Sequence, residues 1–102
     1  MAQFLLLAYD GTDEGAAARR RAVRPAHFEG IKPLVARGEL RAAGAILDDA
    51  GRMIGSAVMA EFPSRAELDA WLAREPYVTE GVWQKIEIRP FRMAVFDGKI
   101  TP

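Results

Sequence analysis

Hydrophobic residues gather in four short runs whose length and spacing predict β-strands. The runs cover residues 3–9, 40–47, 53–62 and 82–91. The first run is apolar at nearly every position, which indicates a strand that is buried on both faces. The fourth run alternates, and the alternation places Ile86 and Ile88 on one face and Trp83 on the other, among charged residues. A hairpin loop at residues 48–51 joins the second and third runs.

Two segments between these runs carry helical patterns. Residues 14–37 hold apolar or aromatic side chains three or four positions apart, and Gly38 is a suitable C-cap. Pro25 interrupts this segment, so we expect a break or a kink near it. Ser64 and Glu67 have the spacing of a capping box, which starts a second helix that ends at Pro76.

The predicted order is strand, helix, strand, strand, helix, strand, which is the ferredoxin-like split βαββαβ arrangement. We therefore expect an α+β fold with an antiparallel sheet, formed by a single domain over residues 1–102. Residues 92–102 form a short C-terminal extension in this scheme, and the Asp97-Gly98 turn predicts a small extra ribbon within it.

The predicted sheet has one face that the helices of this chain do not cover. Two helices cover only one face of four strands, yet the strand at residues 3–9 is apolar on both of its faces. We expect a second copy of the chain to cover the open face, so that two sheets pack against each other in a homodimer. The alternative is that the C-terminal extension folds back over this face.

Composition excludes several classes of protein. The chain has 102 residues, 14 Lys plus Arg, 14 Asp plus Glu, a formal net charge of zero, one histidine and no cysteine. Without cysteine there is no disulfide scaffold, no thiolate metal site and no thiol nucleophile. One histidine and no acidic cluster with ligand spacing predict that there is no metal site, and we expect no cofactor.

Charge and hydropathy also limit the partners. A net charge of zero provides no field to hold a polyanion. Residues 13–27, which contain the arginine run, include no aromatic side chain, so we expect no nucleic-acid partner. No apolar stretch approaches the roughly 20 residues that cross a bilayer. The start of the chain lacks the basic region of a secretory signal, so we expect a cytoplasmic protein with no membrane partner.

His27 is the residue best suited to acid–base chemistry near neutral pH. It shares a helical stripe with Ile31 and Leu34, so we expect its ring to point toward the sheet. Asp10 ends the strand that leads into this helix, and it is the predicted partner that orients the ring and leaves the other ring nitrogen free for proton transfer. Arg20 lies seven residues earlier on the same stripe, where it could hold a substrate oxygen.

Each of these residues also has a purely structural interpretation. His27 could be a core histidine bound to one carbonyl, and Asp10 could serve only the turn that follows the strand. Arg20 belongs to a basic run, and such runs usually form a solvated helix face. The residues alone leave both interpretations open.

Several short motifs together resemble the YCII-related (YciI-like) family. They follow one another in the family's order over nearly the whole chain: Asp10, Arg24-Pro25-x-His27, Gly38-Glu39-Leu40-x-x-x-Gly44, Gly55-Ser56, Pro76-Tyr77-x-x-x-Gly81-Val82 and Ile88-x-Pro90-Phe91. The resemblance implies a ferredoxin-like fold that dimerises into an α/β barrel, with a pocket around a His–Asp pair at His27 and Asp10. It also implies that Ser56 and Tyr77 line this pocket.

The chain departs from the family pattern at two positions. Ala45 follows Gly44 where the family has proline, and Glu75 precedes Pro76-Tyr77 where the family has aspartate. Glutamate keeps the charge on a longer side chain, so the resemblance alone does not assign a catalytic role to Glu75.

These observations favour a small enzyme of the lyase or isomerase type that needs no cofactor. His27 would transfer a proton and Asp10 would orient it. Arg20, Ser56 and Tyr77 would bind a small oxygenated substrate, which could be cyclic. The first alternative is a non-catalytic dimer that only binds a small ligand in the same pocket. The second is a structural dimer with a core histidine.

Overall fold

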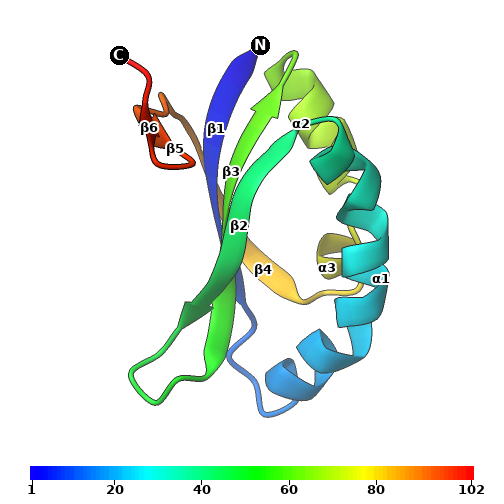
Figure 1. The fold of residues 1–102 in the computed structure, drawn as a ribbon. Coiled ribbons are helices and arrows are strands. Elements are labelled where there is room, and N and C mark those ends of the chain that lie inside the picture. The colour runs from blue at the N-terminus through cyan, green and yellow to red at the C-terminus, as the bar shows by residue number, and fades with distance from the viewer.

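A four-stranded antiparallel sheet with its helices on one face makes up the fold in the computed structural model, which describes residues 1–102 (Figure 1). The elements are β1 (Ala2–Asp10), α1 (Ala16–Ala36), β2 (Leu40–Leu47), β3 (Met53–Phe62), α2 (Arg65–Leu72), α3 (Pro76–Thr79), β4 (Trp83–Pro90), β5 (Val95–Phe96) and β6 (Lys99–Ile100). The strand order is β2-β3-β1-β4, and every neighbouring pair is antiparallel. This arrangement confirms the predicted ferredoxin-like α+β fold. None of the helices combines the length and the hydropathy of a bilayer-spanning segment.

The hydrophobic core lies between the sheet and the helices. Alternate residues of the two central strands point toward the helices and are buried: Phe4, Leu6 and Ala8 from β1, and Val58, Ala60 and Phe62 from β3. Leu34 of α1 and Leu68 and Trp71 of α2 close the core from the other side. Burial of one large apolar side chain contributes about 1.5–3 kcal/mol, so this layer holds the helices against the sheet.

Helix α1 runs through Pro25 and Pro33 without a break, so of the two expected outcomes at Pro25, a break or a kink, the break is wrong. Each proline removes one hydrogen bond to the carbonyl four residues earlier. For Pro25 that carbonyl belongs to Arg21, a residue on the exposed side of the helix. Ile31 and Leu34 pack on the core, and this tertiary packing holds the helix together across both prolines.

The C-terminal end of α1 confirms the predicted role of Gly38. Its backbone is left-handed, with a φ of 77°. The Gly38 N–H donates to the Val35 carbonyl at 3.1 Å, and the Glu39 N–H donates to the Leu34 carbonyl at 2.9 Å. These are the two hydrogen bonds of a Schellman motif, which ends the helix and turns the chain into β2.

A β-bulge at the start of β4 turns Trp83 toward the helices. Tyr9 pairs with Lys85 while Asp10 pairs with Trp83, so Gln84 is an extra residue on β4. The prediction that Trp83 shares a face with the charged residues is therefore wrong, and Trp83 is 3% exposed within the core. The physical reason is that one extra residue moves the side chains before it to the other face of the sheet.

A short helix that the sequence pattern does not predict follows α2. Pro76 occupies its first turn, and Glu75 is its N-cap, whose carboxylate accepts the Tyr77 N–H. The pattern indicates only the end of α2 at Pro76, but proline is also favoured at the first position of a new helix. Ser64 caps α2 as predicted, with its hydroxyl oxygen accepting the Glu67 N–H at 3.3 Å.

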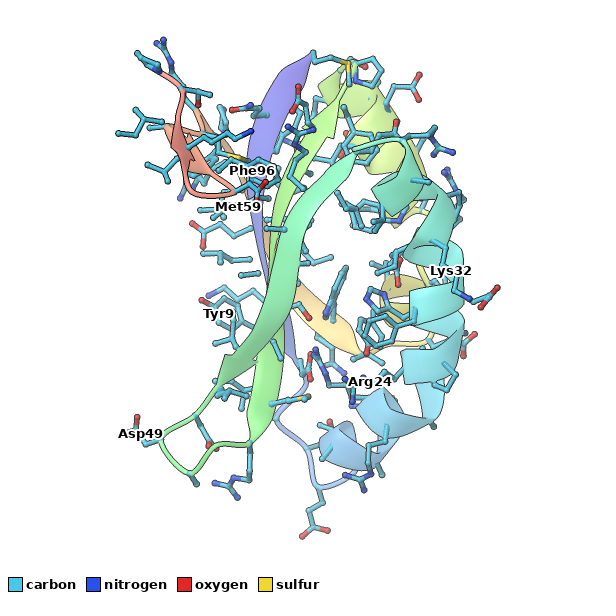
Figure 2. All side chains as sticks on the ribbon, viewed as in Figure 1. Tyr9, Arg24, Lys32, Asp49, Met59 and Phe96 are labelled. Carbon is cyan, nitrogen blue, oxygen red and sulfur yellow. The ribbon has the colours of Figure 1, made fainter.

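The face of the sheet opposite the helices is only partly covered. Leu5, Leu7 and Tyr9 of β1 alternate with the core residues and remain partly accessible. Figure 2 shows Tyr9 directed away from the helices. The C-terminal segment packs on one end of this face, where the Met93 N–H donates to the Gln3 side chain at 2.7 Å. The segment therefore covers one end of the face and leaves the rest open.

Candidate functional site

A cavity of about 230 Å³ lies between α1 and the side of the sheet that faces the helices. Ten of its 15 lining residues are hydrophobic. The lining also holds Arg20, Arg24 and His27 from α1, Ser56 from β3 and Tyr77 from α3. An apolar pocket with a few convergent polar groups is the common form of a small-molecule site. No three His, Asp or Glu side chains of the chain are placed to share a metal ion.

His27 is hydrogen-bonded to Glu75. Its Nδ1 lies 2.5 Å from Glu75 Oε1, and the glutamate side chain is 1% exposed. The same oxygen accepts the Tyr77 backbone N–H at 3.2 Å, so it acts as an acceptor and Nδ1 carries the proton. Nε2 makes no hydrogen bond within the chain, and His27 lines the cavity, so this nitrogen is available to a bound molecule.

Asp10 pairs with Arg20, and the predicted direct pair of His27 and Asp10 is wrong. Arg20 Nη1 lies 2.9 and 3.0 Å from the two Asp10 carboxylate oxygens. The reason is the length of α1: His27 lies seven residues beyond Arg20, which is about 10 Å farther along the helix axis. Asp10 ends β1 beside the first turns of α1. It stands behind Arg20 and is not part of the cavity lining.

Ser56 joins this ion pair to the indole of Trp83. Its hydroxyl oxygen accepts hydrogen bonds from Arg20 Nη2 at 2.9 Å and from Trp83 Nε1 at 3.2 Å. Gly55 permits this position, since a Cβ atom there would lie 2.4 Å from the Ala8 carbonyl oxygen and push β3 away from β1. With two bonds accepted, the Ser56 hydroxyl keeps its own proton to donate.

Tyr77 stacks on the His27 ring. The ring centroids are 4.0 Å apart with an interplanar angle of 11°, and Trp83 meets Tyr77 edge-on at 5.3 Å. Burial raises the pKa of the Tyr77 hydroxyl, although the Arg20 and Arg24 guanidinium groups act in the opposite direction. The phenol is therefore neutral near pH 7, and the stack holds the plane of the imidazole.

Sequence reasoning misses two residues of the site. Glu75 reaches His27 from the N-cap position of α3, and the signal for it is the Glu-Pro pair, which is typical of a helix start. Arg24 lines the cavity beside His27, three positions earlier on α1. The helical spacing that points to His27 points equally to Arg24.

Comparisons with known proteins agree with the fold and the motifs. The YCII-related domain family matches residues 2–92. The chain is similar to protein YciI of Escherichia coli, with 34% identity over 95 residues that cover 87% of this chain and 95% of that protein. The family match extends over β1–β4, the three helices and the cavity, and it ends before the ribbon of β5 and β6.

Two solved structures share the fold. One is 5-chloro-2-hydroxyhydroquinone dehydrochlorinase (TftG) from Burkholderia phenoliruptrix in complex with 2,5-dihydroxybenzoquinone, with a TM-score of 0.76 and 22% identity over 88% of this chain and 93% of that one. The other is a dimeric ferredoxin-like protein of unknown function from Jannaschia sp., with a TM-score of 0.51 and 17% identity over 91% of this chain and 100% of that one. At these identities the likeness shows the fold alone. The match over residues 2–92 and the 34% identity to YciI show that the chain belongs to the YCII-related domain family.

Proposed function

We propose that this protein is an enzyme that moves a proton on a small, oxygen-bearing ring, in a reaction of the lyase or isomerase type. The observation that carries the proposal is the His27–Glu75 pair, in which a buried carboxylate holds one ring nitrogen and the other is open to an apolar cavity. The similar protein TftG is a dehydrochlorinase in complex with 2,5-dihydroxybenzoquinone. This supports a hydroxylated ring as the class of substrate.

The proton transfer is the task of His27 Nε2. It takes a proton from a C–H or O–H group of the bound ring, and the electron pair of that bond stays on the ring. In an isomerisation the proton returns to another ring atom. In an elimination the electron pair of the broken C–H bond forms a double bond, while a leaving group such as chloride departs with its bonding electrons. A positioned imidazole contributes about 10²–10⁴-fold to such a step.

Neighbouring residues prepare His27 for this task. Glu75 stabilises the imidazolium that forms when Nε2 takes a proton, because its carboxylate is buried and hydrogen-bonded to Nδ1. Tyr77 keeps the ring plane fixed by stacking on it. Asp10 contributes indirectly, by holding Arg20 at the cavity wall.

Turnover of a panel of hydroxylated rings tests the proposal. The panel includes 5-chloro-2-hydroxyhydroquinone, with chloride release as the readout, and 2,5-dihydroxybenzoquinone serves as a binding probe. We expect His27→Ala to lose about 10²–10⁴-fold in activity with an unchanged circular dichroism spectrum. Lys32→Ala, whose side chain points away from the sheet in Figure 2, is the control. Retained turnover in His27→Ala overturns the mechanism, and binding without any turnover identifies a ligand-binding protein instead.

We also propose that two chains pair through the open face of the sheet. Leu5, Leu7 and Tyr9 form an apolar row on that face which a second copy would bury. The similar protein from Jannaschia is dimeric, which supports this pairing. Light scattering should give twice the chain mass of 11.2 kDa for the wild type and a single chain mass for Leu7→Glu. A monomeric wild type would overturn the pairing.

A further inference from the structure

The lining of the cavity carries positive charge and no carboxylate. Its ionisable members are Arg20, Arg24, His27 and Tyr77, and none of the 15 lining residues is Asp or Glu. The two acidic side chains nearby stand behind the lining, where Asp10 is bonded to Arg20 and Glu75 to His27. Since Asp10 is bonded to Arg20 and Glu75 to His27, Arg24 provides the one positive charge of the lining that has no carboxylate beside it, and this charge is complementary to an anion.

Arg20 and Arg24 differ in what they can offer to a ligand. Arg20 donates from both Nη groups, to Asp10 and to Ser56, and it is 7% exposed. Arg24 is an exposed residue that forms no ion pair and no hydrogen bond within the chain, and its guanidinium carbon lies 5.2 Å from the centre of the Phe28 ring. Figure 2 shows Arg24 in the space between α1 and the sheet. A guanidinium without a carboxylate keeps five N–H donors in a planar fork, so Arg24 is the available cation of the site.

The size and the walls of the cavity limit the ligand that fits. An engineered protein cavity of about 150 Å³ holds benzene, so a volume of about 230 Å³ accommodates one substituted ring. Phe28, Trp83 and Ile31 line the cavity, and such surfaces favour the flat face of an aromatic or conjugated ring. A ring without a charge would leave Arg24 with no partner but water.

We propose that Arg24 selects substrates by their charge, binding the anionic oxygen of a planar ring whose reacting edge reaches His27. The two side chains lie three positions apart on α1, which places their Cβ atoms about 5–6 Å from each other on one helix face. A single substituted ring spans that distance. The reaction at His27 is taken from the proposed function. The preference for an anionic ligand rests only on the charge of the cavity lining.

The role of Arg24 can be tested by binding alone, with ligands matched in size and with matched variants, so that no turnover needs to be measured. Benzoate and benzamide have nearly the same size and differ in charge, and Trp83 in the cavity wall reports their binding by its fluorescence. The wild type should bind benzoate about tenfold more tightly than benzamide, since the carboxylate forms an ion pair with the guanidinium of Arg24 whereas the amide offers it only an uncharged carbonyl oxygen. Arg24→Gln should lose this preference and Arg24→Lys should keep part of it. Arg21→Gln, which removes an exposed arginine outside the cavity, is the control and should behave as the wild type.

Two results would overturn the role of Arg24: equal affinity of the wild type for benzoate and benzamide, or an unchanged preference in Arg24→Gln. A second anion, 2,5-dihydroxybenzoquinone, extends the test from carboxylates to enolates. About tenfold weaker binding of it by Arg24→Gln supports the proposal, and unchanged binding counts against it. The two proposals can fail independently. The binding preference tests the role of Arg24, and the turnover of His27→Ala tests the reaction.

Discussion

An ion pair and a histidine–carboxylate hydrogen bond stand beside one cavity, and they differ in how completely their carboxylates are satisfied. In the pair of Arg20 and Asp10, both carboxylate oxygens accept hydrogen bonds. In the pair of His27 and Glu75, one carboxylate oxygen accepts twice, while Oε2 is buried without a partner and the imidazole Nε2 remains open. In the first pair Arg20 Nε is itself buried without a partner, but both acceptor oxygens are used and the pair stabilises one arrangement. In the second pair the open Nε2 leaves a nitrogen available for proton transfer. In our proposal the first pair serves the architecture and the second the chemistry.

The largest expected effect comes from breaking the first pair. Asp10→Ala should lower the free energy of unfolding by about 3–5 kcal/mol, because it leaves the buried Arg20 guanidinium without its counter-charge. Urea unfolding measures this loss. Asp13→Ala is the matched control, since it breaks the exposed pair with Arg19 near the start of the same helix, and its loss should be much smaller. Equal losses in the two variants would show that burial does not distinguish these pairs.

Breaking the hydrogen bond between His27 and Glu75 should lower the catalytic activity. Glu75→Gln should lower kcat about 10- to 100-fold, because a hydrogen bond to a charged group contributes about 1.5–3 kcal/mol and an amide cannot stabilise an imidazolium. Nitrogen NMR of His27 adds a readout: the neutral ring should carry its proton on Nδ1 in the wild type, whereas in Glu75→Gln it should populate a mixture of the Nδ1–H and Nε2–H tautomers. Glu80→Gln changes an exposed carboxylate and serves as the control. Unchanged turnover and an unchanged tautomer would remove Glu75 from the mechanism.

The smallest expected effect is a loss of stability at alkaline pH that depends on Tyr77, whose ring stacks on His27. Burial raises the pKa of Tyr77 above its ordinary value of 10.0, so the folded state holds the phenol proton more tightly than the unfolded state. The stability from this group is fully present below about pH 10 and is lost as the pH rises through the raised pKa. Urea midpoints should therefore fall in this range for the wild type and fall less in Tyr77→Phe. Tyr9→Phe is the control, and the same flattening in both variants would contradict the assignment to Tyr77.

Local patterns predicted most of the fold because burial and turn chemistry act over a few residues. The four strands, the capping role of Ser64 and the end of α1 at Gly38 all follow from neighbouring residues. The alternation placed Trp83 on the wrong face of the sheet, because a single extra residue in β4 reverses the pattern. Such a bulge depends on the pairing of β4 with β1, which the sequence pattern does not contain. The continuity of α1 at Pro25 was not predicted either, because packing on the core holds the helix together where local propensity favours a break.

The sequence by itself determined the order of the four strands and of the two longer helices, and it placed Arg20 and His27 on one side of a helix, since helical periodicity is a local property. Only the tertiary structure decided which carboxylate meets which base. His27 and Glu75 are 48 positions apart in the chain, and their contact depends on where α3 packs against α1. Asp10 is closer in sequence, but the rise of α1 carries His27 away from it and leaves Arg20 in its place.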